Sequence, residues 1–165
     1  MSLKSKAAAT AAAVSLTAGT PALSNEAMDL ITSFYQTADS TDAPMDDLEV
    51  FFADSFKDQN RPVMAPDGVP DRGVALNLFS ELKQGFPDGT HTLDILSPVG
   101  PDVAMVYWTF QGTHSGSFFG TPASGNEISI NGVDIFRVQD GKFVEQWHVE
   151  ELMSLFQQIA SPQHR

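Results

Sequence analysis

Asp134 and His148 are the two residues whose chemical types and spacing best fit acid/base catalysis. Asp134 is a single carboxylate in a row of alternate residues that is otherwise apolar or glycine, namely Ile128, Ile130, Gly132, Phe136 and Val138. Burying an unpaired carboxylate is costly, and a nearby histidine offsets that cost and holds a proton near neutral pH. An Asp–His pair in an apolar pocket can remove a proton beside a carbonyl group. The same pair can instead be a buried polar contact that fixes the strand register and performs no chemistry.

The turn between the two strands decides whether Asp134 and His148 share a face of the sheet. Asp140 and Gly141 are turn residues, and a turn with a glycine bulge predicts four cross-strand pairs: Val138 with Lys142, Phe136 with Val144, Asp134 with Gln146, and Gly132 with His148. In that register Asp134 and His148 lie diagonally on one face. A plain two-residue turn shifts the register by one residue and separates them. We favour the bulge because the row that contains Asp134 is otherwise apolar.

Six further residues are predicted to contact a ligand: His114, Asn60, Trp108, Phe118, Phe136 and Gln146. His114 shares a predicted strand face with Trp108, and it can donate a hydrogen bond to a ligand oxygen or to a loop carbonyl. Phe118 lies in a loop rich in glycine and proline, where it either caps the pocket mouth or packs beneath the loop. Glu150 is expected at the start of the last helix, where a carboxylate favours the helix dipole. His91 has no evident partner in the sequence.

These residues must be positioned by the helices and strands of the chain, and the sequence predicts helices first and then a run of strands. Apolar residues at helical spacing predict helices over residues 25–38, 45–52, 72–86 and 150–160. Alternating residues predict strands over 90–97, 103–115, 127–138 and 142–148, and residues 58–70 are predicted to form a loop. This order indicates an α+β domain in which helices pack on one face of a curved antiparallel sheet and enclose a conical pocket.

The composition limits the classes of function. The chain has 165 residues, enough for one domain, and its lack of cysteine excludes disulfides and thiolate chemistry. A net charge of −12 argues against binding to nucleic acid or to anionic membranes. The sequence contains no His-x-His motif, no zinc-protease motif and no local cluster of carboxylates, so we expect no metal site.

Residues 1–24 differ from the rest of the chain. Lys4 and Lys6 precede a run rich in alanine that extends to Ala18, and small residues follow, which is the outline of an export signal. The alternative is a disordered tail, so an exported and a cytoplasmic location both stay open. We expect residues 25–160 to form the domain and residues 161–165 to form a short tail.

Several stretches of the chain together form a recognisable signature, namely Gly112–Gly125, Gly132–Arg137, Asp140–Lys142, Val144–Trp147, Phe86–Asp88, Leu155 and Gln158. This pattern is similar to the signature of the SnoaL-like polyketide cyclase family, which has the nuclear transport factor 2-like fold. The resemblance extends roughly from Met28 to Ile159. It implies a cone-shaped α+β domain that acts on small carbonyl compounds of polyketide type without a metal or an organic cofactor. Fold alone does not decide the activity.

One position departs from the family pattern. Cyclases of this family place an aspartate directly after the tryptophan of the last strand as acid/base, whereas this chain has His148 after Trp147. They can carry a histidine about where this chain has Asp134, and often one where Gln59 lies beside Asn60. The aspartate-based mechanism therefore cannot be transferred unchanged.

Two hypotheses of function follow from the residues. In the first, the protein is an enzyme in which His148 is the acid/base and Asp134 orients it, acting on a small apolar ligand. In the second, the protein is a binding module without turnover. A third reading is an oligomerisation domain, because Val133, Ile135, Phe143 and Trp147 are expected on the outer face of the sheet. A homodimer through that face would cover them.

Overall fold

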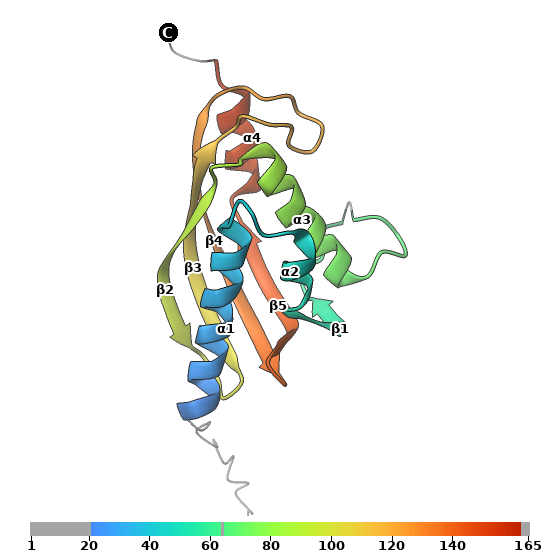
Figure 1. The fold of residues 1–165 in the computed structure, drawn as a ribbon, viewed down its shortest axis with the longest axis vertical. Coiled ribbons are helices and arrows are strands. Elements are labelled where there is room, and N and C mark those ends of the chain that lie inside the picture. The colour runs from blue at the N-terminus through green and yellow to red at the C-terminus, as the bar shows by residue number, and fades with distance from the viewer. Residues whose placement is uncertain (1–20, 64, 163–165) are drawn as a thin grey trace, which may run out of the picture.

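The computed structural model describes residues 21–63 and 65–162 (Figure 1). Its helices are α1 Pro21–Asp39, α2 Met45–Glu49, α3 Asp71–Gly85 and α4 Leu152–Ala160, and its strands are β1 Phe52–Asp58, β2 Thr90–Pro98, β3 Val103–Thr113, β4 Glu127–Gln139 and β5 Lys142–Glu150. The predicted helices and strands are confirmed, with differences at their ends. Most of residues 1–24, the segment with the outline of an export signal, lies outside the described residues, and residues 21–24 belong to α1. None of the described helices is long and apolar enough to cross a membrane.

The strands form one sheet in the order β1-β5-β4-β3-β2. Neighbours are antiparallel except for β1, which runs parallel to β5. The prediction missed β1 and extended the second helix over its first residue. The reason is local: Phe52 and Phe56 are the buried residues of β1, and their spacing of four fits a helix as well as a strand. β1 matters for the site because it ends at Asp58.

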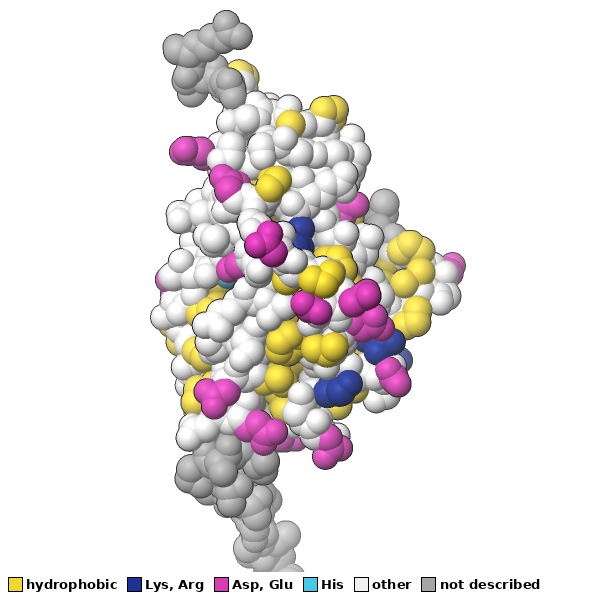
Figure 2. Space-filling model, in the orientation of Figure 1, with side chains coloured by type: hydrophobic (Ala, Val, Ile, Leu, Met, Phe, Trp, Pro, Cys, Tyr) yellow, Lys and Arg dark blue, Asp and Glu magenta, His cyan; other side chains and the backbone are white. Residues whose placement is uncertain are grey.

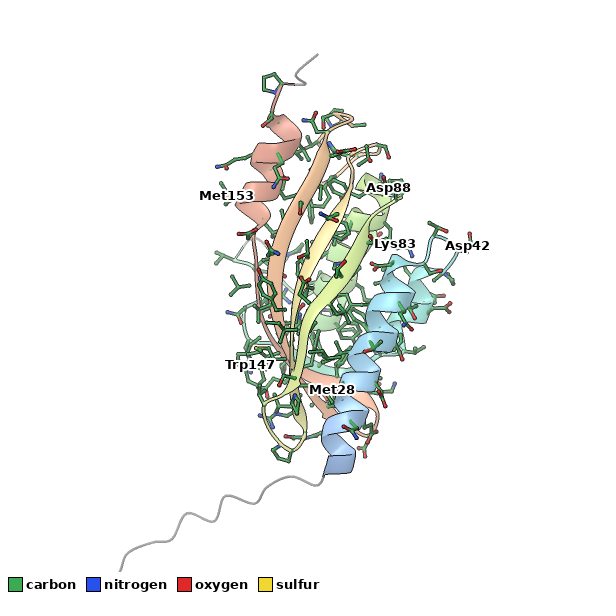
Figure 3. All side chains as sticks on the ribbon, turned by 90° about the vertical axis from the view of Figure 1, so that its left-hand side faces the viewer. Met28, Asp42, Lys83, Asp88, Trp147 and Met153 are labelled. Carbon is green, nitrogen blue, oxygen red and sulfur yellow. The ribbon has the colours of Figure 1, made fainter. Side chains whose placement is uncertain are left out.

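The helices α1, α2 and α3 cover one face of the curved sheet (Figures 1 and 3). Alternate residues of β3 and β4 are buried against them, as the period of a strand requires. The ring of Phe34 on α1 is central to this core, and it meets the rings of Phe52, Phe79 and Phe143 at centroid distances of 5.5, 4.9 and 5.4 Å. Acidic side chains are scattered over the helical side of the molecule, and few basic ones accompany them (Figure 2).

In the β4–β5 hairpin, Asp134 and His148 lie on the same face as predicted, but the turn and the pairing of the strands differ from the prediction. Asp140 and Gly141 have φ of 51° and 69°, which makes a two-residue turn that pairs Gln139 with Lys142. A β-bulge follows within β5, because Arg137 pairs with Glu145 while Val138 pairs with Phe143. The predicted partner is therefore wrong by one residue for Val138 and by two residues for Phe136, Asp134 and Gly132, and Asp134 pairs directly with His148. Their position on one face is confirmed, because the bulge reverses the change of face that the tight turn causes.

The tight turn, which precedes the bulge, places Phe143 on the inner face opposite Val138. Phe143 is fully buried and stacks on Phe136 at 4.2 Å between centroids, so its predicted place on the outer face is wrong. Val133, Ile135 and Trp147 remain on the outer face, where they are partly exposed. Figure 3 shows Trp147 on the side of the sheet that faces away from α1.

The last helix, α4, takes the place beside β4 that β5 leaves when it ends at Glu150. The Gln158 amide mimics a strand there: its Nε2 donates to the Ser129 carbonyl at 2.9 Å, and its Oε1 accepts from the Ser129 N–H at 2.8 Å. Asn126 Nδ2 donates to the Gln158 and Ser161 carbonyls at the end of α4. α4 begins at Leu152 rather than at the predicted Glu150, which is the last residue of β5.

Candidate functional site

A cavity of about 60 Å³ lies between α3 and the inner face of the sheet. Much of its wall is apolar and comes from Val74, Leu78, Phe79, Leu82, Phe110 and Ile130. The polar side chains of the wall are Tyr35, Asp58, His91, Asp134, Gln146, His148 and Glu150. This volume holds roughly four water molecules, so a larger ligand requires the side chains of the wall to move apart.

His148 lies in this wall between two carboxylates. Its Nε2 is 3.0 Å from Asp58 Oδ1 and its Nδ1 is 2.5 Å from Glu150 Oε1. Both ring nitrogens can donate to these acceptors only in the doubly protonated form. Burial lowers the pKa of His148, but the hydrogen bonds and the charges of Asp58 and Glu150 outweigh burial and raise this pKa to about 10. His148 is therefore an imidazolium at neutral pH, with the character of an acid.

Asp134 is satisfied by other partners than the predicted histidine. Its carboxylate accepts hydrogen bonds from the Tyr35 hydroxyl, from Trp108 Nε1 at 2.5 Å and from Gln146 Nε2 at 2.7 Å. Burial raises the pKa of the Asp134 carboxyl, and the three donors oppose this rise. Burial and the neighbouring Asp134 also raise the pKa of Tyr35, which keeps its hydroxyl protonated as a donor. The polar atoms of Asp134 and His148 lie within 4.8 Å of each other, a separation that one water molecule can bridge.

The cluster also meets the distance requirement for a shared cation. Ligand atoms of Asp134, His148 and Glu150 all lie within 4.8 Å of one another. The expectation that Glu150 begins a helix kept it apart from Asp134 and His148, whereas Glu150 is the last residue of β5 and joins them. A divalent cation could bind only after His148 had lost a proton and the Asp134 oxygens had exchanged their donors. The imidazolium already supplies the positive charge that such a cation would bring.

The other predicted ligand contacts divide into two groups. Trp108 and Gln146 line the cavity. Phe136, Phe118, His114 and Asn60 do not belong to its wall as described. Phe136 is stacked in the core, and Phe118 packs on Phe86 at 5.3 Å beneath its loop. His114 Nδ1 contacts Ser124 Oγ at 3.0 Å, and Asn60 Oδ1 accepts the backbone N–H of His148 at 3.1 Å.

Several polar residues of the wall escaped the sequence analysis. Asp58 is the first residue of a predicted loop, Glu150 is the first residue of a predicted helix, and Tyr35 lies within the helix predicted over residues 25–38. His91 has a partner after all, because Asp39 at the end of α1 lies 2.6 Å from its Nδ1. The alternation of β2 could have placed His91 on the inner face. No local pattern could have paired it with a residue 52 positions away.

The fold agrees with that of the family that the sequence resembles. The family model for the SnoaL-like polyketide cyclase matches residues 26–159, and the chain belongs to this family. Among curated protein sequences, none matches the chain.

Several solved structures share the fold of this chain. A candidate SnoaL-like polyketide cyclase from Jannaschia sp. CCS1 is 20% identical, with a TM-score of 0.70 over 87% of this chain and 97% of that one. TsrD from Streptomyces laurentii is 24% identical, with a TM-score of 0.64 over 87% and 98%. IdmH, a candidate polyketide cyclase from Streptomyces antibioticus, is 25% identical, with a TM-score of 0.65 over 82% and 99%.

Proposed function

We propose that this protein is an acid/base enzyme that acts, without a metal or an organic cofactor, on a small apolar carbonyl compound of polyketide type. Ring closure by an intramolecular aldol reaction, or an isomerisation, is the proposed reaction class. The observation that carries the proposal is the imidazolium of His148, held in the cavity wall between Asp58 and Glu150. Membership of the SnoaL-like polyketide cyclase family and the fold shared with IdmH support the same class.

The proposed role of His148 is to stabilise and protonate an oxyanion. Removing a proton beside a carbonyl group places negative charge on the carbonyl oxygen, and an aldol step then places it on a new alkoxide. A fixed N–H donor in a cavity with little water stabilises such charge better than solvent does. The ligand oxygen would take the place of one of the two carboxylates at the ring, and the other would keep the ring oriented. Asp134 is then a neighbour of the acid, within reach of a bridging water, and orients it only indirectly.

A binding module without turnover is the second candidate. The small volume of the cavity and the complete hydrogen bonding of Asp134 favour it. In that case His148 and its two carboxylates balance each other's charge and do no chemistry. The two functions differ in what the loss of the imidazolium does to turnover.

Replacing His148 by Gln is expected to lower turnover about 10²–10⁴-fold with little change in ligand affinity, because glutamine keeps a hydrogen bond but has no proton to give. Substrates come from thermal-shift screening of small apolar ketones and diketones. Lys142→Gln is the matched control, since it introduces the same side chain at the exposed start of β5. EDTA should leave turnover unchanged. Consumption of a compound at equal rates by wild type and His148→Gln contradicts the proposed role, and binding without consumption favours the second candidate.

We also propose a homodimer through the outer face of the sheet. Val133, Ile135 and Trp147 leave apolar surface on that face, and neighbouring Val149 is 71% exposed. Light scattering should give twice the chain mass of 17.8 kDa. Ile135→Glu is expected to dissociate the dimer, because it buries an unpaired charge in the interface. A wild-type monomer at all concentrations would rule the dimer out.

A further inference from the structure

The cavity contains a second histidine, His91, whose surroundings differ from those of His148. His91 is the second residue of β2 and points to the inner face, where it pairs across the strands with Phe110. Its ring lies among aromatic rings, at centroid distances of 4.7 Å from Phe110, 4.8 Å from Tyr35 and 5.2 Å from Trp108. Its side chain is 4% exposed, yet it forms part of the cavity wall. His91 is thus a polar group in an apolar pocket.

Asp39 holds this imidazole at two points. Its Oδ1 is 2.6 Å from His91 Nδ1, and its Oδ2 accepts the backbone N–H of His91 at 2.7 Å. A carboxylate at Nδ1 favours the tautomer that carries its proton there, and the other nitrogen is then an acceptor. Lys83 donates to the carbonyls of Ala38 and Ser40 beside this carboxylate. Asp39 therefore holds the ring of His91 through Nδ1 and leaves Nε2 without a partner in the described residues.

Nothing in the described part of the chain is bonded to the other nitrogen of His91. Among these residues, the single fully buried side-chain nitrogen or oxygen that lacks a partner is His114 Nε2. His91 Nε2 is therefore not fully buried. The ring of His91 borders this cavity and also a smaller one of about 10 Å³, and Asp39, which Nδ1 contacts, lines only the smaller one. His148 is the opposite case, because carboxylates occupy both of its nitrogens and it is already protonated.

We propose that His91 is the general base of this site and that Asp39 is its positioning residue, so that proton removal and proton donation belong to different histidines of one cavity. This inference rests on the proposed function. His91 Nε2 takes the proton from the carbon beside a carbonyl group, and the electron pair of the broken C–H bond forms the enolate. The enolate carbon then attacks a second carbonyl of the same molecule, and the new alkoxide takes a proton from His148. At the end His91 holds the proton from the carbon and His148 has lost one to the alkoxide, and proton exchange with water restores both histidines.

The two protonation states can be measured without any ligand. In a long-range ¹⁵N–¹H NMR spectrum of the full chain at neutral pH, His91 is expected to carry a proton on Nδ1 and none on Nε2. His148 is expected to be protonated on both nitrogens. Asp39→Asn should weaken the preference of His91 for the Nδ1–H tautomer. A doubly protonated His91, or a proton on Nε2 alone, overturns the inference.

The chemical step is tested with cyclohexanone in D₂O, because a compound with one carbonyl group can exchange its protons but cannot close a ring. Wild-type protein is expected to exchange the protons beside the carbonyl for deuterium, and His91→Gln is expected to do so about 10²–10⁴-fold more slowly. Asp39→Asn should show a smaller loss. Thr92→Gln is the matched control, since Thr92 is the next residue of β2 and is exposed. Thermal melting identifies any variant that fails to fold.

The outcomes separate this inference from the proposed function. Equal exchange rates in wild type and His91→Gln overturn the role of His91 and leave an enzyme with a different base. A wild type that exchanges no protons contradicts the proposed function itself, and the inference falls with it. Loss of exchange in His91→Gln with an unchanged melting temperature supports both.

Discussion

The free energy of unfolding is expected to fall as the pH rises from about 6.5 to about 10, because folded protein and unfolded chain hold the His148 proton with different strengths. The pKa of His148 is about 10 in the folded protein, against an ordinary value of 6.5. Below the ordinary value both states hold the proton, and the stabilisation by Asp58 and Glu150 is complete. Between the two values the unfolded chain has released the proton and the folded protein still holds it, so the stabilisation declines. Above the folded value it is lost.

The expected size of this change is about 2–4 kcal/mol. Each unit of pKa shift corresponds to roughly 1.4 kcal/mol, and partial screening by solvent reduces the sum over the whole window. Urea unfolding of wild type and of His148→Gln across this pH range isolates the contribution, because all other titrating groups are common to the two proteins. Glu150→Gln should have a weaker pH dependence than wild type and a lower pKa of the imidazole by NMR. Parallel curves for wild type and His148→Gln would show that the two carboxylates do not hold a proton on the ring.

The strand pattern was sufficient to predict the fold class and every strand except β1, and the predicted register failed where two irregularities occur together. Alternation in β4 and β5 is strong, so the strands themselves were predicted. The tight turn at Asp140 and Gly141 and the bulge after Phe143 each change the facing of β5, and the sequence argument allowed for only one of them. Together, the turn and the bulge return the residues after the bulge to the faces that were predicted for them. Asp134 and His148 were therefore placed correctly while Phe143 was not.

The site was predictable only as far as neighbouring strands could bring residues together. Asp134 and His148 lie on adjacent strands, and a register argument connects them. Asp58 reaches His148 from β1, a strand with two inward phenylalanines and no clear alternation. Asp39 reaches His91 from the end of a helix, which no register relates to β2. Contacts of this kind arise from how the layers pack, and a single sequence carries no signal for them.

Gly132 allows the indole of Trp108 to lie against β4. The two residues pair across β3 and β4, and a Cβ added to Gly132 would lie 2.1 Å from Trp108 Cζ2 and 2.6 Å from Cε2. These distances are far shorter than van der Waals contact, and the obstacle is a rigid ring that is 5% exposed. The same indole donates from Nε1 to Asp134. Any movement that makes room for a methyl group at residue 132 therefore disturbs this hydrogen bond as well.

Gly132→Ala is accordingly expected to lower the free energy of unfolding by about 2–6 kcal/mol. Overpacking a core usually costs about 1–3 kcal/mol, and leaving a buried polar group without its partner costs about 1–3 kcal/mol more. Urea unfolding at neutral pH measures the change. Gly73→Ala is the control, because its added Cβ meets only the side-chain methyl of Val69, at 3.1 Å, and alanine favours the helix. That variant should change stability by no more than about 1 kcal/mol.

A double-mutant cycle with Trp108→Leu tests the cause of this loss rather than its size. If the indole is the obstacle, Gly132→Ala should cost much less in the Trp108→Leu background, since leucine is smaller, flexible and makes no hydrogen bond to Asp134. If the loss came instead from the backbone of β4, it would be equally large in both backgrounds, because removing the indole would not relieve it. Equal losses would therefore reject the packing of Trp108 on Gly132 as the reason for glycine at this position. If the loss nearly disappears in the Trp108→Leu background, the indole that donates to Asp134 is the cause of the destabilisation by Gly132→Ala.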